Sequence, residues 1–182
     1  MSDDRWYYFL SIEKDFLRTI DFVELHPDNG TAFSNEYAKL LLLIGSEVDV
    51  IAKMLCNREA AGQNASNIIH YQAILTARFA GLHQIGIDIP RYRRKVQPWL
   101  SWDPANPIPP IWWTAHNKVK HERDTNFWRA NQQNTLEAIC GLLALLLYWF
   151  KDEGHLQPYP ELLNFGFPEF LVSHGGQKPP GA

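Results

Sequence analysis

The chain has 182 residues, 46% of them hydrophobic and 20% charged, with a formal net charge of −3. This length suits one domain with a sizeable core, and the composition is that of an ordinary globular protein. The slight negative charge excludes a general electrostatic attraction to nucleic acid, although local basic patches can still bind phosphate. Cys56 and Cys140 lie in apolar helical patterns, which predicts buried thiols rather than a disulfide framework or a thiolate metal site.

No targeting or membrane-spanning segment is predicted. The N-terminal residues MSDDRW are charged, and the apolar residues that follow are interrupted by charges, unlike a signal peptide. The longest apolar run, residues 142–150 with a lead-in from 138–141, is too short to span a bilayer. We therefore expect a cytoplasmic protein with no membrane contact.

Apolar residues recur at helical spacing in several stretches. In chain order, the predicted helices cover residues 4–24, 34–57, 66–79, 112–123 and 134–152. The turn formers HPDNG separate the first two, and Ser34 and Ser66 are the expected N-caps of the second and third. The last helix is apolar on nearly all sides, which is typical of a helix at the centre of a core or in an oligomer interface.

Between the third and fourth predicted helices, residues 81–110 contain six prolines, and helical periodicity fails there. Short strands or a small hairpin fit this insertion. Beyond the last helix the chain is predicted to form an irregular arm and, at 171–182, a disordered tail. The sequence thus predicts an all-α bundle of four or five helices in a single domain, residues 1–170, with a long proline-rich irregular insertion.

The second predicted helix carries one acid on its apolar face. At 100° per residue Glu47 falls within the apolar arc, so it has a buried partner or lies at the edge of the arc. Asp49 and Lys53 lie on the opposite face of the helix, as an i,i+4 surface pair that adds little to stability.

Residues 112–124, WWTAHNKVKHERD, concentrate imidazole, amide, carboxylate and fixed positive charge. On a helical wheel Trp112, Ala115 and Val119 form a narrow apolar stripe. The roughly opposite arc holds Trp113, Asn117, Lys120, His121 and Asp124, with His116 and Arg123 between the two faces. The stripe is expected to dock on the bundle and the arc to face a ligand or solvent.

The polar arc has the groups needed to act on a phosphodiester. His121 would serve as general acid or base, Lys120 and Arg123 would stabilise negative charge, and Asn117 would position the phosphate. The alternative is a solvated helix face. A metal site formed by His116, His121 and Asp124 is not predicted, because histidines five residues apart diverge by about 140° on a helix. No cofactor is expected.

A second cluster is rich in basic and aromatic residues. Arg91, Arg93, Arg94 and Lys95 lie within five residues, close to Tyr92, Trp99 and Trp102. Such a mixture suits a nucleic-acid strand, and Trp113 is a further candidate for stacking on a base. A solvated loop is the alternative. The chain has no glycine-rich phosphate loop and no dinucleotide fingerprint.

The acid in an early helix and the N-x-x-K-H pattern of Asn117, Lys120 and His121 resemble the HEPN superfamily. Bacterial proteins of this kind occur in defence and toxin–antitoxin systems. The resemblance implies an all-α fold, a homodimer that pairs two motif helices across a cleft and, in active members, metal-independent RNA cleavage assisted by Arg and His. It also implies a role for Glu47 as the acid.

The chain departs from the catalytic pattern of that superfamily, which is Arg, then four to six residues, then His. The corresponding positions before His121 are Thr114, Ala115 and His116, and Arg123 follows the histidine. His116 would replace the arginine only if protonated. The sequence therefore favours a protein that binds RNA, a nucleotide or another phosphate-bearing ligand. If the protein has a catalytic activity, we expect it to be a metal-independent endoribonuclease. The alternative is a non-catalytic interaction protein with an antitoxin-type partner, using the helix 136–150 and exposed tryptophans as its interface.

Overall fold

Helices dominate the chain, as the apolar periodicity predicts. The computed structural model describes residues 3–61, 64–152 and 156–165. Within them the α-helices are α1 (Asp3–Ile20), α2 (Asn35–Glu59), α3 (Ile68–Arg78), α4 (Ile111–His121), α5 (Arg123–Asn126) and α6 (Gln132–Trp149). None of these helices is long and apolar enough to cross a membrane. The predicted tail, residues 171–182, lies outside the described residues.

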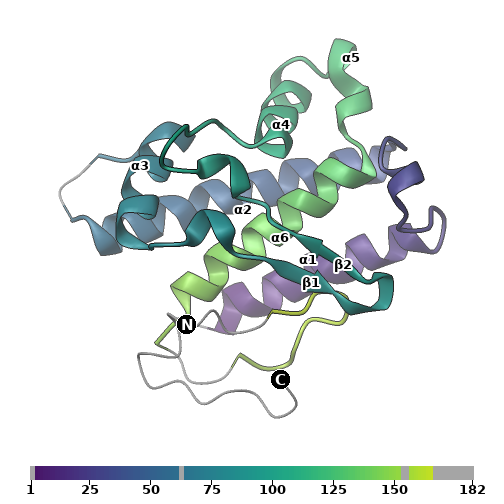
Figure 1. Cartoon of the computed structure of the whole chain (residues 1–182). Helices are drawn as coiled ribbons and strands as arrows, with labels where there is room; N and C mark the ends of the chain where they lie inside the picture. Colours follow the sequence, from purple (N-terminus) through teal and green to yellow (C-terminus); the bar gives the residue numbers. More distant parts are fainter. Residues whose placement is uncertain (1–2, 62–63, 153–155, 166–182) are drawn as a thin grey trace.

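The centre of the fold is α6, which crosses α2 and also contacts α1 and α4 (Figure 1). Only Gln133, Glu137 and Trp149 of this helix are not buried. An all-round apolar helix covered by its own chain belongs to the core. The alternative in which this helix forms an interface with a partner is therefore wrong.

Helix α2 begins where the sequence predicts, because the Ser34 side chain accepts a hydrogen bond from the Tyr37 N–H. The cap of α3 differs from the prediction. Asn67, not Ser66, accepts from the N–H groups of Ile69 and His70, so the helix starts one residue later than the serine would place it. An asparagine cap satisfies two donors that would otherwise face solvent.

The proline-rich insertion contains the predicted hairpin. Strands β1 (Ile87–Ile89) and β2 (Arg94–Val96) pair antiparallel, with Ile87 opposite Val96. Short 3₁₀ turns flank the hairpin. Trp99 and Trp102 of the insertion and Trp112 in the first turn of α4 are buried in the core.

These tryptophans fix α4 against α6. The Trp112 Nε1 donates to the Pro98 carbonyl over 2.9 Å, and the Trp99 Nε1 donates to the Gly141 carbonyl over 3.2 Å. Gly141 has no side chain to keep the rings away, since a Cβ there would lie 2.9 Å from the Trp112 ring. The buried indoles therefore fix the position of the first turn of α4 relative to α6.

The described part of the C-terminal arm is irregular, as predicted, and is held across α1. The buried carboxylate of Glu13 accepts hydrogen bonds from three successive backbone N–H groups, those of Glu161, Leu162 and Leu163. Burial raises the pKa of this carboxyl, while the three donors act in the opposite direction. Asn164 also pairs with Asp88 of β1.

Candidate functional site

A surface pocket of about 230 Å³ opens beside α4. Its lining residues are Ile68, Pro109, Trp113, Thr114, Asn117, Lys118, His121 and Glu122. One wall is apolar and the other carries an amide, an imidazole and an ion pair. Three residues of the predicted polar arc, Trp113, Asn117 and His121, thus line one cavity.

The side chains of Asn117 and His121 are free to bind a ligand. Asn117 is half-buried and His121 is exposed. Among the described residues neither side chain has a hydrogen-bond partner. A polar group that lines a pocket without an internal partner is available to a ligand.

The end of α4 determines how the imidazole is presented. The helix starts at Ile111, directly after residues 107–110, three of which are prolines, and ends at His121 because Glu122 leaves helical geometry (φ −139°, ψ 44°). Lys118, Lys120 and His121 occupy the last turn, where the helix dipole favours positive charge. The chain turns away after His121, so the ring lies at an open helix end.

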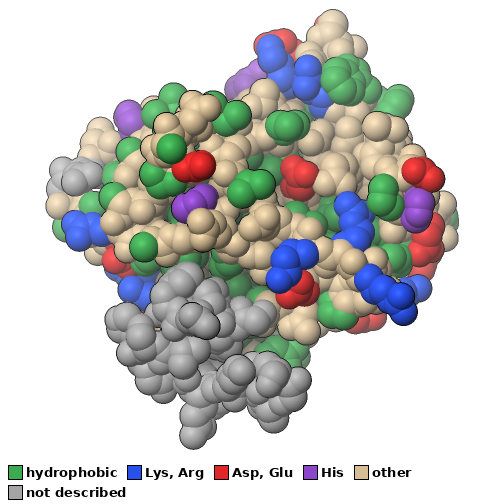
Figure 2. Space-filling model, viewed as in Figure 1, with side chains coloured by type: hydrophobic (Ala, Val, Ile, Leu, Met, Phe, Trp, Pro, Cys, Tyr) green, Lys and Arg blue, Asp and Glu red, His purple; other side chains and the backbone are tan. Residues whose placement is uncertain are grey.

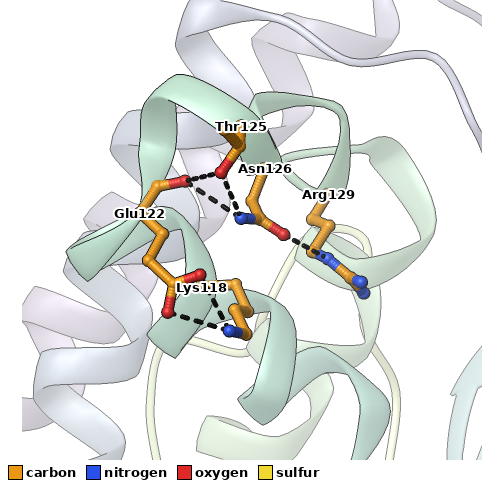
Figure 3. A network of polar contacts seen from close by, with 5 residues as sticks. All are labelled: Lys118, Glu122, Thr125, Asn126 and Arg129. Atoms are coloured by element: carbon orange, nitrogen blue, oxygen red, sulfur yellow. Dashed lines mark hydrogen bonds and ion pairs between the residues drawn. The ribbon is translucent and has the colours of Figure 1, made fainter.

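Lys118 and Glu122 form the charged wall of the pocket. The Lys118 Nζ contacts both carboxylate oxygens of Glu122 at 2.8 Å, and this pair lowers the pKa of Glu122 (Figure 3). Lys118 is a pocket residue that was not among the predicted site residues. Its i,i+4 spacing from Glu122 was the available signal.

His116 lies away from the pocket, against α2. It is 3% exposed, and its ring occupies the space above Gly45, where a Cβ would lie 2.2 Å from the imidazole Cδ2. Both ring nitrogens lack a hydrogen-bond partner among the described residues. Burial, with Lys120 and His121 nearby, lowers the pKa of His116 to about 4, so the ring is neutral.

The helical wheel underestimated how much of α4 is buried. Trp112, Ala115 and Val119 are buried as predicted. Trp113 and His116, placed on the exposed arc and between the faces, are also buried, because α4 contacts both α2 and α6. A helix between two neighbours buries a wider face than one stripe.

Lys120 and Arg123 are exposed and do not line the pocket. Arg123 belongs to α5, and its guanidinium lies 5.5 Å from the centre of the Phe127 ring. His116, His121 and Arg123 therefore do not converge on one cavity within a protomer. Their predicted catalytic roles stay predictions.

The acid whose charge acts on His116 of α4 is Asp49 rather than Glu47. Glu47 is half-buried at the edge of the apolar arc and has no hydrogen bond or ion pair with the described residues. Asp49 accepts from the Tyr71 hydroxyl over 2.8 Å, lies 3.7 Å from Lys53 and opposes the lowering of the His116 pKa. The surface pairing of Asp49 and Lys53 is confirmed.

The basic cluster lies at the hairpin turn, on the other side of α6 from α4 (Figure 1). Arg93 has a left-handed backbone (φ 50°) that makes the turn. Lys95 lies 3.3 Å from Asp88, Arg94 donates to Gln133 over 3.0 Å, and Arg91 lies over the Tyr92 ring. This cluster does not contribute to the α4 pocket.

Metal ligands do not gather at the site. Across residues 3–61, 64–152 and 156–165 no group of three His, Cys, Asp or Glu residues is placed to hold a metal ion. His116 and His121 point to different surroundings, the first toward α2 and the second into the pocket. The pocket can offer hydrogen bonds, a flat apolar wall and one imidazole ring.

No protein-family model, curated protein or solved structure matches the chain.

Proposed function

We propose that this protein is a HEPN-like RNA-binding protein and that the α4 pocket receives one nucleotide of an RNA strand. The observation that carries the proposal is that Asn117 and His121 line one open pocket with no partner of their own. The amide can bond to a base edge or phosphate, and the buried indole of Trp113 offers an apolar wall. The predicted bundle, cytoplasmic location and N-x-x-K-H motif belong to the same proposal.

The proposed activity is binding rather than cleavage by one protomer. Metal-independent cleavage needs a proton acceptor, a proton donor and a stabiliser of negative charge. The pocket supplies one imidazole, and the charge of Lys118 is already neutralised by Glu122. Cleavage would require a second His121, contributed by another copy of the chain.

A homodimer is part of the proposal because apolar side chains are exposed near the pocket. Ile69, Ile108 and Ile111 are 64%, 54% and 73% exposed, and each is within two residues of a lining residue. Exposed apolar groups around a polar pocket are typical of a contact surface. We call these three isoleucines the pocket rim.

Replacing Ile111 by Asp is expected to convert a dimer into a monomer, because a charge in an apolar contact has to be desolvated. Sedimentation equilibrium measures the change, with Phe22→Asp as the control, since Phe22 is 88% exposed and does not line the pocket. A wild-type chain that stays monomeric would contradict the dimer. Together with failure to bind RNA, it would favour the alternative, in which the rim contacts an antitoxin-type protein.

The proposed function is tested with a labelled single-stranded RNA in EDTA. We expect Asn117→Ala and His121→Ala each to weaken binding about tenfold, the effect of one lost hydrogen bond to a charged or polar group. His83→Ala is the matched control, because His83 is half-exposed and does not line the pocket.

Binding that is unchanged in both pocket variants would contradict the proposal. The same reactions report cleavage. Equal background degradation by the wild type and by His121→Ala would exclude a nuclease that uses this histidine.

A further inference from the structure

Aromatic rings and arginines gather around the segment that follows α4. The cluster comprises Arg123, Phe127, Trp128 and Arg129 of that segment and Phe33, which precedes α2 and packs on Phe127, and we call it the stacking platform. Phe33, Arg123 and Trp128 are exposed, whereas Phe127 and Arg129 are half-buried. Trp128 and Phe33 are each 52% exposed. The other described tryptophans are buried or half-buried, so Trp128 stands apart in presenting half of its surface.

The arginines of the platform lie on the aromatic rings. The Arg129 guanidinium is 4.3 Å from the centre of the Trp128 ring, and that of Arg123 is 5.5 Å from the Phe127 ring. Phe33 meets Phe127 edge to face at 5.4 Å between ring centres. Each ring is thereby held in place, and each guanidinium keeps donors that can reach an anion.

The local charge is opposite to that of the whole chain. Residues 118–129 carry the cationic Lys118, Lys120, Arg123 and Arg129 and the anionic Glu122 and Asp124, a balance of +4 and −2, whereas the chain as a whole carries −3. Figure 2 shows basic and apolar side chains next to each other over α5. A positive local field beside exposed rings attracts a polyanion that can also stack.

Hydrogen bonds connect the platform to the α4 pocket. Glu122 lines the pocket, and its carbonyl accepts from the Asn126 amide over 3.1 Å. The Asn126 oxygen in turn accepts from the Arg129 Nε over 2.9 Å, as Figure 3 shows. The platform and the charged wall of the pocket are therefore parts of one ordered segment.

We propose that the stacking platform binds single-stranded RNA, with an unpaired base on Trp128 and the neighbouring phosphates on Arg123 and Arg129. The inference rests on the proposed function and names its substrate as an unpaired strand. Only unpaired bases offer a free face to an aromatic ring, whereas paired bases are already stacked. The strand would then continue from the platform to the pocket at His121.

The test is fluorescence anisotropy with a labelled 12-nucleotide single strand and with a duplex of the same sequence. We expect Trp128→Ala to weaken single-strand binding about tenfold, the usual effect of losing one stacked base, and Trp128→Phe to retain most of the affinity. Tyr7→Ala is the matched control, since Tyr7 is 53% exposed on α1, far from α5 in Figure 1.

The duplex is expected to bind more weakly than the single strand. Equal affinity for both, or equal binding by Trp128→Ala and the wild type, would overturn the platform. The pocket is judged separately by His121→Ala. If Trp128→Ala loses binding and His121→Ala does not, the platform is supported and the pocket is not. If His121→Ala loses binding and Trp128→Ala does not, the platform alone is overturned. A wild-type protein that binds no RNA overturns both proposals.

Discussion

Replacing Gly45 by Ala is expected to lower the free energy of unfolding by about 3 kcal/mol, the upper part of the usual range for overpacking a core. The new Cβ would lie 2.2 to 2.5 Å from three atoms of the His116 ring. Both partners are in helices, α2 and α4, so neither can give way without moving its backbone. Urea denaturation followed by circular dichroism measures the change.

Two comparisons make this experiment specific. Gly86→Ala serves as the matched control, because its closest neighbour is the flexible side chain of Lys95, and we expect a change below about 0.5 kcal/mol. His116→Ala combined with Gly45→Ala should cost less than the sum of the two single changes, since the methyl then fills the space left by the ring. Additive effects of the two substitutions would contradict the close packing of His116 on Gly45.

The second large effect is a loss of stability in mild acid. His116 has a folded pKa of about 4, below its ordinary value of 6.5, because burial disfavours the charged ring. Between these two pH values the unfolded chain binds a proton that the folded chain does not. Stability therefore falls as the pH drops from 6.5 to 4, by about 3 kcal/mol in total.

The variant His116→Leu isolates this contribution. The ring nitrogens of His116 have no hydrogen-bond partner among the described residues, so replacing the imidazole by an apolar side chain breaks no hydrogen bond. Buried carboxyls such as Glu13, whose pKa is raised, act in the opposite direction in both proteins and cancel in the comparison. Denaturation series at pH 7, 6, 5 and 4 should give a steeper slope for the wild type. Equal slopes would contradict a neutral, buried His116.

The helices followed from local signals in the sequence. Ser34 caps α2 as predicted, and the all-apolar pattern of residues 136–150 marks a core helix. The place where helices cross did not follow, because it depends on distant residues. Gly45, in the middle of a long helix, was the overlooked sign that α4 packs closely there.

Only the part of the site that depends on local helix geometry could be predicted. Asn117 and His121 share a pocket because residues four apart on a helix lie on one face. His116 and Trp113 are buried, contrary to the prediction, because α4 packs against two helices. Arg123 lies outside the pocket because α4 ends at His121. Neither the number of neighbours nor the helix end at Glu122 can be read from local periodicity.

The most direct test of the α4 pocket as an RNA site is nuclear magnetic resonance of the histidine rings during titration with the single-stranded RNA in EDTA. The His121 ring signals, assigned with His121→Ala, should shift and saturate with the same dissociation constant as binding, while those of His83 should not move. RNA binding that leaves the His121 signals unchanged would contradict the account.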